Sequence, residues 1–335
     1  MNTGPFSTIQ DLGRYGFQDL GIPVSGALDA NSLRVANALV GNAETNAAIE
    51  FRLTGPALRI DADEVLIGLA GTEDSLLIEG SDPRHIKGWH SGVVRRGEIV
   101  YAPVLKDTST AYIAISGGID TVPVLESRST YVRGGIGGHE GRALQAGDEL
   151  PIGRFQGTMK PNMFSDPPRG VPDRLRVVAG PQDDMFTQDA LDRLISNSFS
   201  VTSESDRMGM RLEGPELPHI DSYDIVSDGI ATGAIQVPGN KQPILLLADH
   251  QTTGGYPKIA TVISADIPGA GRLRTGDMIG FAVVTVEEAE AIARETMKRL
   301  HGLIGTNTPA IDPGKIDVDA LYNANLISGI TNMHK

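Results

Sequence analysis

The sequence predicts a mainly β protein with a few helices. Glycine and proline supply 40 and 20 of the 335 residues and are spread along the chain. This suits many turns between short strands, because glycine adopts positive φ and proline fixes φ. Short apolar runs bounded by Gly, Asp or Pro recur throughout, as is typical of strands. At residues 96–100, 146–150 and 275–279, Gly-Asp or Gly-Glu precedes such a run, as in a tight turn that begins a strand.

The predicted strands fall into two groups along the chain. In the first half they span residues 57–61, 64–71, 75–79, 99–104 and 110–116. In the second half they span residues 175–179, 244–248, 261–265 and 278–286. These runs are short and have turn residues at their ends, which fits strands better than helices.

Few helices are expected. Residues 29–39 begin with the N-cap residue Asp29 and are followed by Val-Gly-Asn, which favours a helix end. Residues 183–195 have apolar side chains at amphipathic spacing. Residues 286–300 form the clearest helix, because glutamates near its start and basic residues near its end suit the helix dipole. A shorter helix is expected at 318–325.

A segment rich in proline and glycine divides the chain. Residues 154–173 contain four prolines and two glycines and show no periodic apolar face. We therefore predict an N-terminal lobe at residues 1–156, a linker at 157–173, a C-terminal lobe with a closing helix at 174–300, and a surface tail at 301–335. Similar short motifs in the two halves, such as Asp-Leu-Gly-Arg and Asp-Arg-Met-Gly, indicate that the lobes are related, although the order of the motifs differs.

Composition excludes several classes of protein. The formal net charge is −13, so the chain lacks the excess of lysine and arginine that binds nucleic acid or anionic membranes, and we expect neither partner. The absence of cysteine excludes disulfides, thiolate metal sites and a cysteine nucleophile. No apolar run is long enough to span a membrane, and the N-terminus lacks the features of a signal peptide, so a cytoplasmic location is expected.

The densest group of polar residues lies in segment 233–264. Its loop at 249–257 follows an apolar strand directly, and loops held by buried strands often carry binding groups. An ordinary hairpin connection with solvated side chains is the alternative interpretation. The candidates for substrate binding in this segment are Gln236, Gln251, Thr252 and Tyr256.

Two residues of the same segment are candidates for catalysis. Lys258 follows a proline at the start of an apolar strand. Its ammonium group could stabilise a developing oxyanion, or could simply protect an exposed strand from pairing. His250 could act as a general base near neutral pH, or could form structural hydrogen bonds.

A second group lies near the N-terminus. Asp11 and Arg14 lie three residues apart beside glycines, and they either face a cleft together or pair with each other in a turn. Asp11 is a candidate for proton transfer, while Gln10 and Arg14 are candidates for substrate binding. Ser25 precedes the first predicted helix, whose N-terminus could bind an anion or a carbonyl oxygen, although Asp29 fits a plain N-cap.

A third group surrounds Arg128, which lies between hydroxyl residues. Its guanidinium could bind a substrate carboxylate through two hydrogen bonds, or pair with a nearby surface acid. The glycine-rich segment 134–142 lacks the end of a phosphate-binding loop and the dinucleotide pattern, so nucleotide binding is not expected there. No motif in the sequence requires a metal ion, and no metal site is expected.

Several motifs together resemble one known family. They are TIQDLGRYGFQDLGIPVSGALD, NALVGNAETNAAIEFRLTGPALRI, SRST, SDRMGMRLEGPEL and GAIQVPGNKQPILLLADHQTTGGYPKIATVISAD. In this order, over residues 3–286, they resemble the biotin-dependent carboxyltransferase family. That family includes the C subunit of 5-oxoprolinase, also described as KipA, and allophanate hydrolase subunit 2, and it is related to part of the carboxyltransferase domain of urea carboxylase. The chain departs from the family pattern at Glu126, where glycine is usual, and at Arg272, where glutamine is often found.

The resemblance implies a fold and a set of partners. The fold would be two cyclophilin-like β-barrel lobes. The partners would be a B subunit related to the kinase inhibitor KipI and, in 5-oxoprolinase, an A subunit. That complex opens 5-oxoproline to glutamate with ATP hydrolysis, whereas urea carboxylase passes a carboxyl group from biotin to urea, so both substrates are small amides. A partner subunit would use the ATP, and any biotin would be carried by a partner protein.

Three functions remain as alternatives at this point. The first is the C subunit of a 5-oxoprolinase-type enzyme, active only in its complex, in which Lys258 or Arg128 stabilises an oxyanion and Asp11 or His250 moves the proton. The second is the carboxyltransferase component of a biotin-dependent urea or amide carboxylase. The third is a KipA-type regulatory protein that binds a KipI-like inhibitor of a histidine kinase.

Overall fold

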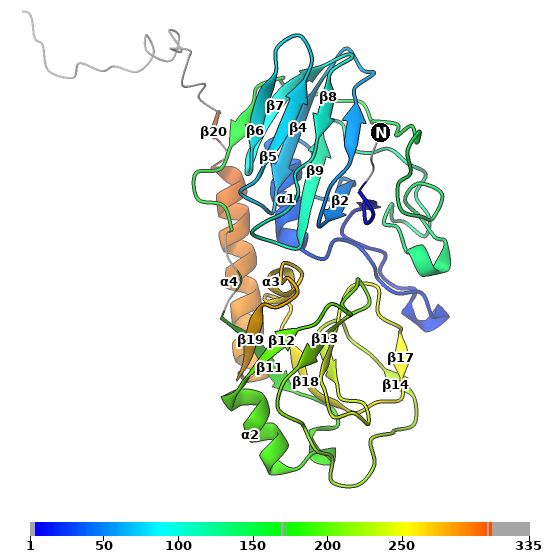
Figure 1. The fold of residues 1–335 in the computed structure, drawn as a ribbon, viewed down its shortest axis with the longest axis vertical. Coiled ribbons are helices and arrows are strands. Elements are labelled where there is room, and N and C mark those ends of the chain that lie inside the picture. Colours follow the sequence, from blue (N-terminus) through cyan, green and yellow to red (C-terminus); the bar gives the residue numbers. More distant parts are fainter. Residues whose placement is uncertain (1–3, 169–170, 172, 307, 310–335) are drawn as a thin grey trace, which may run out of the picture.

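Two β-rich lobes, stacked along the long axis of the molecule, make up the fold (Figure 1). The computed structural model describes residues 4–168, 171, 173–306 and 308–309. Strands outnumber helices in both lobes, so the prediction of a mainly β protein with a few helices is confirmed.

The N-terminal lobe consists of two sheets. The larger sheet has the order β1 (Thr8–Gln10), β2 (Ala48–Arg52), β9 (Thr110–Ile115), β4 (Glu64–Ala70), β7 (His90–Arg95), β10 (Asn162–Met163) and β20 (Thr308–Pro309). The smaller sheet has the order β3 (Ala57–Arg59), β8 (Ile99–Tyr101), β5 (Ser75–Glu79) and β6 (Arg84–Lys87). Both sheets contribute side chains to one apolar core, which includes Ile49, Phe51 and Val100.

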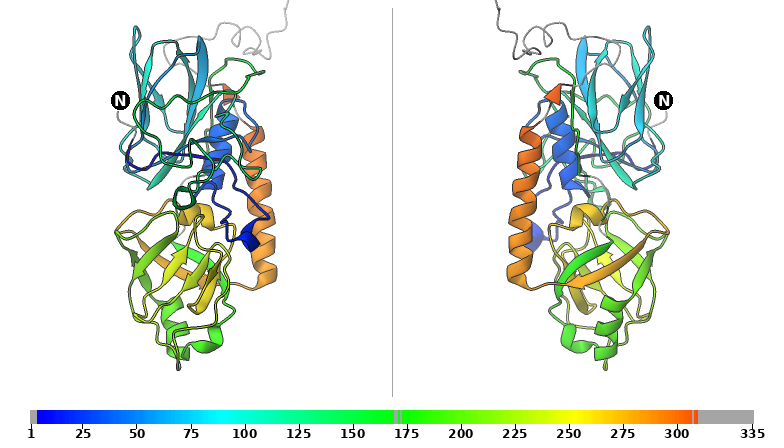
Figure 2. Two further views of the ribbon diagram at one scale, coloured as in Figure 1. Left: turned by 90° about the vertical axis from the view of Figure 1, so that its right-hand side faces the viewer. Right: turned by 90° about the vertical axis from the view of Figure 1, so that its left-hand side faces the viewer.

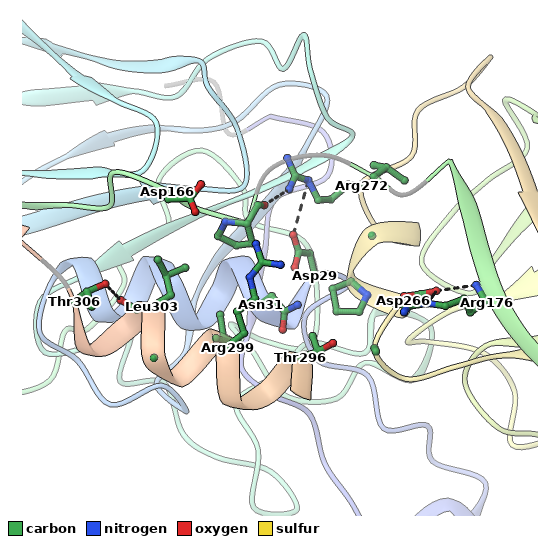
Figure 3. Close-up of a pocket in the computed structure, with 17 residues that line it drawn as sticks. Asp29, Asn31, Asp166, Arg176, Asp266, Arg272, Thr296, Arg299, Leu303 and Thr306 are labelled. Carbon is green, nitrogen blue, oxygen red and sulfur yellow. Dashed lines mark hydrogen bonds and ion pairs between the residues drawn. The ribbon is translucent and has the colours of Figure 1, made fainter. Parts of the chain in front are cut away.

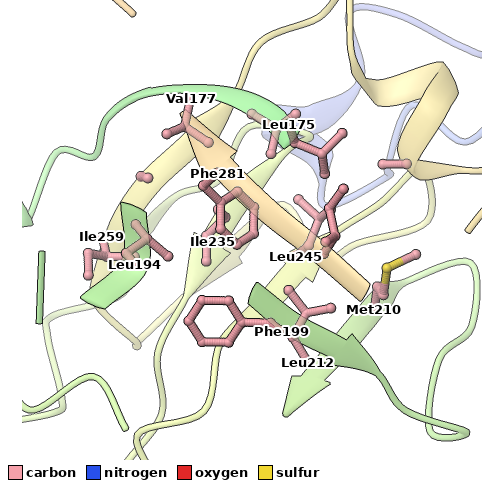
Figure 4. Close-up of a cluster of buried hydrophobic side chains, with 14 of the residues drawn as sticks. Leu175, Val177, Leu194, Phe199, Met210, Leu212, Ile235, Leu245, Ile259 and Phe281 are labelled. Atoms are coloured by element: carbon pink, nitrogen blue, oxygen red, sulfur yellow. The ribbon is translucent and has the colours of Figure 1, made fainter. Parts of the chain in front are cut away.

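The C-terminal lobe is the closed barrel of the fold. Its strands follow the order β11 (Arg174–Ala179), β18 (Lys258–Val262), β15 (Ala234–Gln236), β16 (Ile244–Leu246), β13 (Gly209–Glu213), β12 (Ser198–Val201) and β19 (Met278–Val283). Apolar side chains fill it (Figure 4), and the rings of Phe199 and Phe281 lie 5.9 Å apart between centroids. Outside the barrel, β14 (Asp228–Gly229) and β17 (Thr253–Gly254) form a separate two-stranded flap.

The resemblance implied two barrel lobes, and in the N-terminal lobe the strands form two sheets around one core. Among the described strands, only those of the C-terminal lobe form a closed barrel. The reason lies between β2 and β3. Leu53 has a φ of 62°, and Pro56 follows it, so the chain turns away from the larger sheet and β3 joins the smaller one.

The helices begin where capping residues predict. Asp29 caps α1 (Ala30–Leu39) by accepting a hydrogen bond from the Ser32 amide at 3.0 Å. The predicted helix at 183–195 divides into the 3₁₀ turn η3 (Asp183–Met185) and α2 (Gln188–Ser196). Thr285 and Glu288 form a capping box at the start of α4 (Val286–Gly305), which extends past the predicted end at residue 300. The shorter elements are α3 (Ile267–Ala270), η1 (Gln18–Leu20) and η2 (Val132–Gly134).

Helix α4 connects the two lobes. It begins after β19 of the barrel and runs beside α1 (Figure 2). Its Leu300 is 5% exposed and packs in the same apolar cluster as Leu33 and Leu39 of α1. Beyond it, β20 pairs with β10 in the larger sheet of the N-terminal lobe. No helix in the described ranges has both the length and the apolar character needed to cross a membrane.

Most predicted strands are found, with differences at their ends. The strand at 75–79 is found with its predicted bounds as β5, whereas the strand predicted at 261–265 is β18, at Lys258–Val262. It ends early because the chain turns at Ile263, where the carbonyl accepts a hydrogen bond from the Asp266 amide. The domain boundaries stay a prediction, and the predicted helix at 318–325 lies outside the described residues.

Candidate functional site

A buried lysine marks the first cluster of predicted residues. Lys258 begins β18 and is 3% exposed. Its Nζ donates to Oδ2 of Asp228 at 3.0 Å, and its amide donates to Oε1 of Gln182 at 3.2 Å. Gln182 also donates to Asp228 at 3.3 Å. The hydrogen bond from Lys258 holds the pKa of the Asp228 carboxyl below its usual value, so this carboxyl is ionised at neutral pH.

Amide side chains surround this lysine. Gln236 lies opposite Lys258 in the pairing of β15 with β18, and its Nε2 donates to the carbonyl of Tyr256 at 3.3 Å. A Cβ atom built on Gly254 would lie 2.9 Å from Nε2 of Gln236 and 3.5 Å from Nε2 of Gln251. Glycine at this position therefore leaves room for two primary amides beside the flap.

The flap brings a third segment to the same place. Asp228 and Gly229 of β14 pair with Gly254 and Thr253 of β17, and the carbonyl of Thr252 accepts a hydrogen bond from the Ile230 amide at 3.0 Å. The flap thus carries Asp228 to Lys258. The structure brings together the predicted residues of segment 233–264 at one end of the barrel, and it adds Asp228 and Gln182, which the sequence analysis missed.

His250 has a structural position within this cluster. It is 4% exposed, with Nδ1 2.6 Å from the carbonyl of Gln251 and Nε2 3.0 Å from Oγ1 of Thr232. Burial lowers the pKa of His250. A neutral ring that donates through Nδ1 and accepts at Nε2 satisfies both contacts. The ring therefore braces the loop, as the alternative interpretation of this residue proposed.

Asp11 organises a loop in the N-terminal lobe. It is 9% exposed. Its Oδ1 accepts hydrogen bonds from the Gly13 amide at 2.8 Å, the Ser127 hydroxyl at 2.7 Å and the Ser129 hydroxyl at 2.5 Å. Its Oδ2 accepts from the Arg128 amide at 2.6 Å. Four donors occupy the carboxylate, which suits a positioning role better than proton transfer.

Arg128 and Gln10 are occupied in the same region. Arg128 donates through Nε to the carbonyl of Thr121 at 2.7 Å and through Nη2 to Oδ1 of Asp120 at 2.6 Å. This is the pairing with a surface acid that the alternative interpretation described. Gln10 is fully buried and donates to the carbonyl of Thr130 at 3.1 Å, so it ties β1 to the Arg128 loop. Among the described residues, Oε1 of Gln10 has no hydrogen-bond partner.

Arg14 and Ser25 retain unused donors at the junction of the lobes. Arg14 is 1% exposed and donates through Nη2 to the carbonyl of Ser129, while its Nε and Nη1 have no partner among the described residues. Burial lowers the pKa of Arg14, which the nearby carboxylates of Asp11 and Asp249 oppose. Ser25 has a φ of 55° and its amide donates to the carbonyl of residue 248 at 3.0 Å.

A buried ion network joins the lobes beside this junction. Arg207 of the C-terminal lobe donates to the two carboxylate oxygens of Asp249 at 2.8 and 3.0 Å. It also donates to Glu50 and to the carbonyl of Gly26, both in the N-terminal lobe. Burial tends to lower the pKa of Arg207, but Asp249 and Glu50 outweigh it and raise the pKa. In the sequence, Arg207 belongs to the Asp-Arg-Met-Gly motif, which is the feature that could have pointed to it.

Two cavities lie away from these residues. One of about 630 Å³ lies between the lobes (Figure 3), and one of about 660 Å³ opens between the sheets of the N-terminal lobe. None of the predicted site residues lines either cavity. Among the described residues, no group of three or more His, Asp or Glu side chains is placed to hold a metal ion.

Comparisons with known proteins fit this architecture. The family described as "Carboxyltransferase domain, subdomain A and B" matches residues 20–283. The C subunit of 5-oxoprolinase from Escherichia coli is 37% identical over 296 residues, which cover 86% of this chain and 92% of that protein.

Solved structures of similar fold belong to related proteins. The urea carboxylase of Kluyveromyces lactis matches with a TM-score of 0.81 and 26% identity, over 95% of this chain and 30% of that one. The structure of TTHA0988 matches with a TM-score of 0.75 and 34% identity, over 84% of this chain, which spans 55% of that solved chain. This chain therefore belongs to the carboxyltransferase-domain family that contains subdomains A and B.

Proposed function

We propose that this chain is the C subunit of a 5-oxoprolinase-type complex, which opens the lactam of 5-oxoproline to glutamate with hydrolysis of ATP. The observation that carries the proposal is the 37% identity to the corresponding E. coli protein over nearly all of its length. The partners would be a KipI-like B subunit together with an A subunit. One of these partners would use the ATP, and the chain would act as an enzyme only within this complex.

Lys258 is the group proposed to act on the lactam carbonyl. Opening the ring adds one water across the C–N bond, and negative charge develops on the carbonyl oxygen during the attack. One N–H of the Lys258 ammonium points to Asp228, which leaves two for that oxygen. Such a preorganised donor contributes about 3–4 kcal/mol to stabilising the transition state.

The residues around Lys258 support this role. Asp228 and Gln182 hold the backbone and ammonium of Lys258 in place, and we propose that they act as positioning residues. The amides of Gln236 and Gln251 lie beside the flap and match the donor and acceptor of a small cyclic amide. Tyr256, 39% exposed, and Thr252 complete the proposed binding surface.

The N-terminal residues have supporting roles in the proposal. Asp11 and Gln10 hold the Arg128 loop, and His250 braces the loop next to Lys258. Arg14 and Ser25 stay candidates for binding the substrate carboxylate, because their unused buried donors favour an acceptor. We leave Arg128 out of the substrate site, since Asp120 already occupies it.

A carboxyltransferase function is the second candidate. The TM-score of 0.81 to the K. lactis urea carboxylase favours it. The biotin would be carried by a partner protein, and the donors of Lys258 and Gln251 fit the oxygen of its ureido group. When bound, biotin would supply the carboxyl group that is transferred to urea or another amide. The KipA-type regulatory function stays a prediction.

Reconstitution tests the proposal. The chain is mixed with its A and B partners, and release of glutamate and ADP from 5-oxoproline and ATP is measured with and without the chain. We expect both products only when all three proteins are present. A folded, verified complex that releases no glutamate, but carboxylates urea when a biotinylated carrier is added, would replace the first candidate by the second.

Variants test the role of Lys258 in the same complex. Lys258→Met should lower kcat by about 100- to 1,000-fold, the effect of losing one oxyanion donor. The control is Lys298→Met, because Lys298 lies exposed on α4 and should keep full turnover. Equal turnover of the two variants would contradict the assignment of Lys258.

A further inference from the structure

The cavity between the lobes is separate from the Lys258 cluster. Its walls come from the start of α1, from β11, from α3 and the residues that flank it, from α4, and from Asp166, Pro168 and Val171 (Figure 3). Its volume of about 630 Å³ lies within the usual range for small-molecule sites. Both lobes and the connecting helix therefore contribute to one pocket, for which the proposed reaction has no use.

One wall of this pocket is electrically neutral. Arg176 donates through Nη2 to Oδ1 of Asp266 at 2.5 Å and through Nε to Oδ2 at 3.0 Å. The backbone amide of Arg176 also donates to Oδ2 at 2.7 Å. Asp266 is 3% exposed, and both of its carboxylate oxygens accept hydrogen bonds from Arg176. This pair therefore forms a fixed wall of the pocket and offers no free charged group to a ligand.

Another side of the pocket carries a buried cation, Arg272, whose donors are only partly satisfied. Arg272 is 7% exposed and lies over the ring of Trp89, with its Cζ atom 5.8 Å from the ring centroid. Its Nη1 donates to the carbonyl of Pro168 at 2.7 Å. Its Nε has no hydrogen-bond partner among the described residues and stays 4.0 Å from Oδ2 of Asp29. That oxygen already accepts from the Ser32 hydroxyl at 2.5 Å.

A second cation faces the pocket from α4. Figure 3 shows Arg299 rising from the helix toward the side of the pocket where Arg272 and Asn31 lie. Within the described part of the chain, no hydrogen bond or ion pair engages the Arg299 side chain. Two guanidinium groups on facing walls, each with unused donors, match the planar oxygens of a carboxylate or phosphate.

We propose that this pocket binds a small organic anion whose carboxylate or phosphate lies between Arg272 and Arg299. The apolar walls suit a short carbon skeleton, and they come from Pro168, Val171, Pro268, Leu300 and Leu303. Because the anion contacts α4 and both lobes at once, it stabilises their arrangement. This inference does not rest on the proposed reaction.

The experiment measures binding to the isolated full-length chain. Isothermal titration and thermal unfolding are carried out with succinate, with inorganic phosphate and with the neutral diamide succinamide, at one ionic strength set with sodium chloride. We expect succinate or phosphate to bind and to raise the melting temperature, while succinamide does neither. Binding by succinate alone assigns an organic carboxylate, and binding by phosphate assigns a phosphate group.

Variants test whether the anion binds in this pocket. Arg299→Gln should weaken binding at least tenfold, whereas Arg294→Gln should leave it unchanged. Arg294 lies on the same helix, is exposed, and pairs only with Glu290 at 3.3 Å. Arg272→Gln should also weaken binding, and the exposed Arg299 decides the question if Arg272→Gln does not fold. Absence of binding by both anions, or equal affinity of the Arg299 and Arg294 variants, would overturn the proposal.

Discussion

Replacing Arg207 by methionine should destabilise the whole protein more than replacing any exposed charged residue does. Arg207 donates four hydrogen bonds, two to Asp249, one to Glu50 and one to the carbonyl of Gly26. The side chains of Glu50 and Asp249 are 1% and 7% exposed, so the variant leaves two buried carboxylates without their cation. Removing one partner of such a buried ion pair costs about 3–5 kcal/mol.

This cost can be converted into a melting temperature. With an unfolding entropy of about 2.1 cal/mol/K per residue, a chain of this length loses about 0.7 kcal/mol/K at its midpoint. The Arg207→Met variant should therefore melt about 4–7 °C lower than the parent chain. Circular dichroism during heating gives this shift, and urea unfolding gives the free energy at 25 °C.

The control lies on the neighbouring strand. Arg211 of β13 is half exposed and pairs with Glu204 at 3.4 Å, so Arg211→Met should change stability by about 0.5 kcal/mol or less. A double variant with Glu50→Gln should recover part of the loss, because one buried charge is removed with its partner. A loss below about 1 kcal/mol for Arg207→Met, or equal losses for both arginines, would refute the reasoning.

Three further predictions concern single positions. Burial lowers the pKa of His250, so between that value and about 6.5 the unfolded chain binds more protons. The free energy of unfolding should therefore fall as the pH drops through this range, and it should fall less in His250→Gln. Urea unfolding at several pH values measures this dependence. The control variant His301→Gln, at an exposed position, should show the same dependence as the parent chain. Asp228→Asn removes the negative charge that positions the ammonium of Lys258, so it should lower kcat of the reconstituted complex about 10- to 100-fold; unchanged turnover would contradict its positioning role. In Gly137→Ala the new Cβ would lie 2.1 Å from a backbone carbonyl oxygen, whereas in Gly147→Ala it meets nothing within 4 Å. Both glycines have a positive φ, which an alanine adopts only with strain. Urea unfolding should therefore show that the free energy of unfolding falls by about 1–2 kcal/mol in Gly147→Ala and by clearly more in Gly137→Ala. Equal losses in the two variants would contradict this expectation.

Local signals account for what the sequence predicted well. The N-cap at Asp29 and the acidic start of α4 are encoded within one turn of each helix, and both helices begin where expected. The short strand β5 matches because its apolar run ends in turn residues on both sides. Strands β6 and β7 escaped prediction because polar residues interrupt their apolar pattern.

Long-range contacts account for what the sequence did not predict. The assignment of β3 to a second sheet depends on how the chain turns after Leu53, and no periodicity records it. The roles of Asp11 and Arg128 depend on partners such as Ser129 and Asp120, which only the fold identifies.

The candidate site shows the same division. Its residues in segment 233–264 were predictable because most of them lie within one loop and the strand that follows. Asp228 and Gln182 stand in segments without a motif, and only the flap brings them to Lys258.

The course of the chain makes the barrel an insertion. Strands β1 and β20, from the two ends of the described chain, belong to the same sheet of the N-terminal lobe. The chain enters the barrel at Arg174 and leaves it at Val283, on neighbouring parallel strands, so the entry and exit points are roughly 10 Å apart. A truncation before α4 would thus remove a helix and an edge strand from the first lobe and leave the barrel whole. Conversely, joining residue 173 to residue 284 by a short linker would delete the barrel alone.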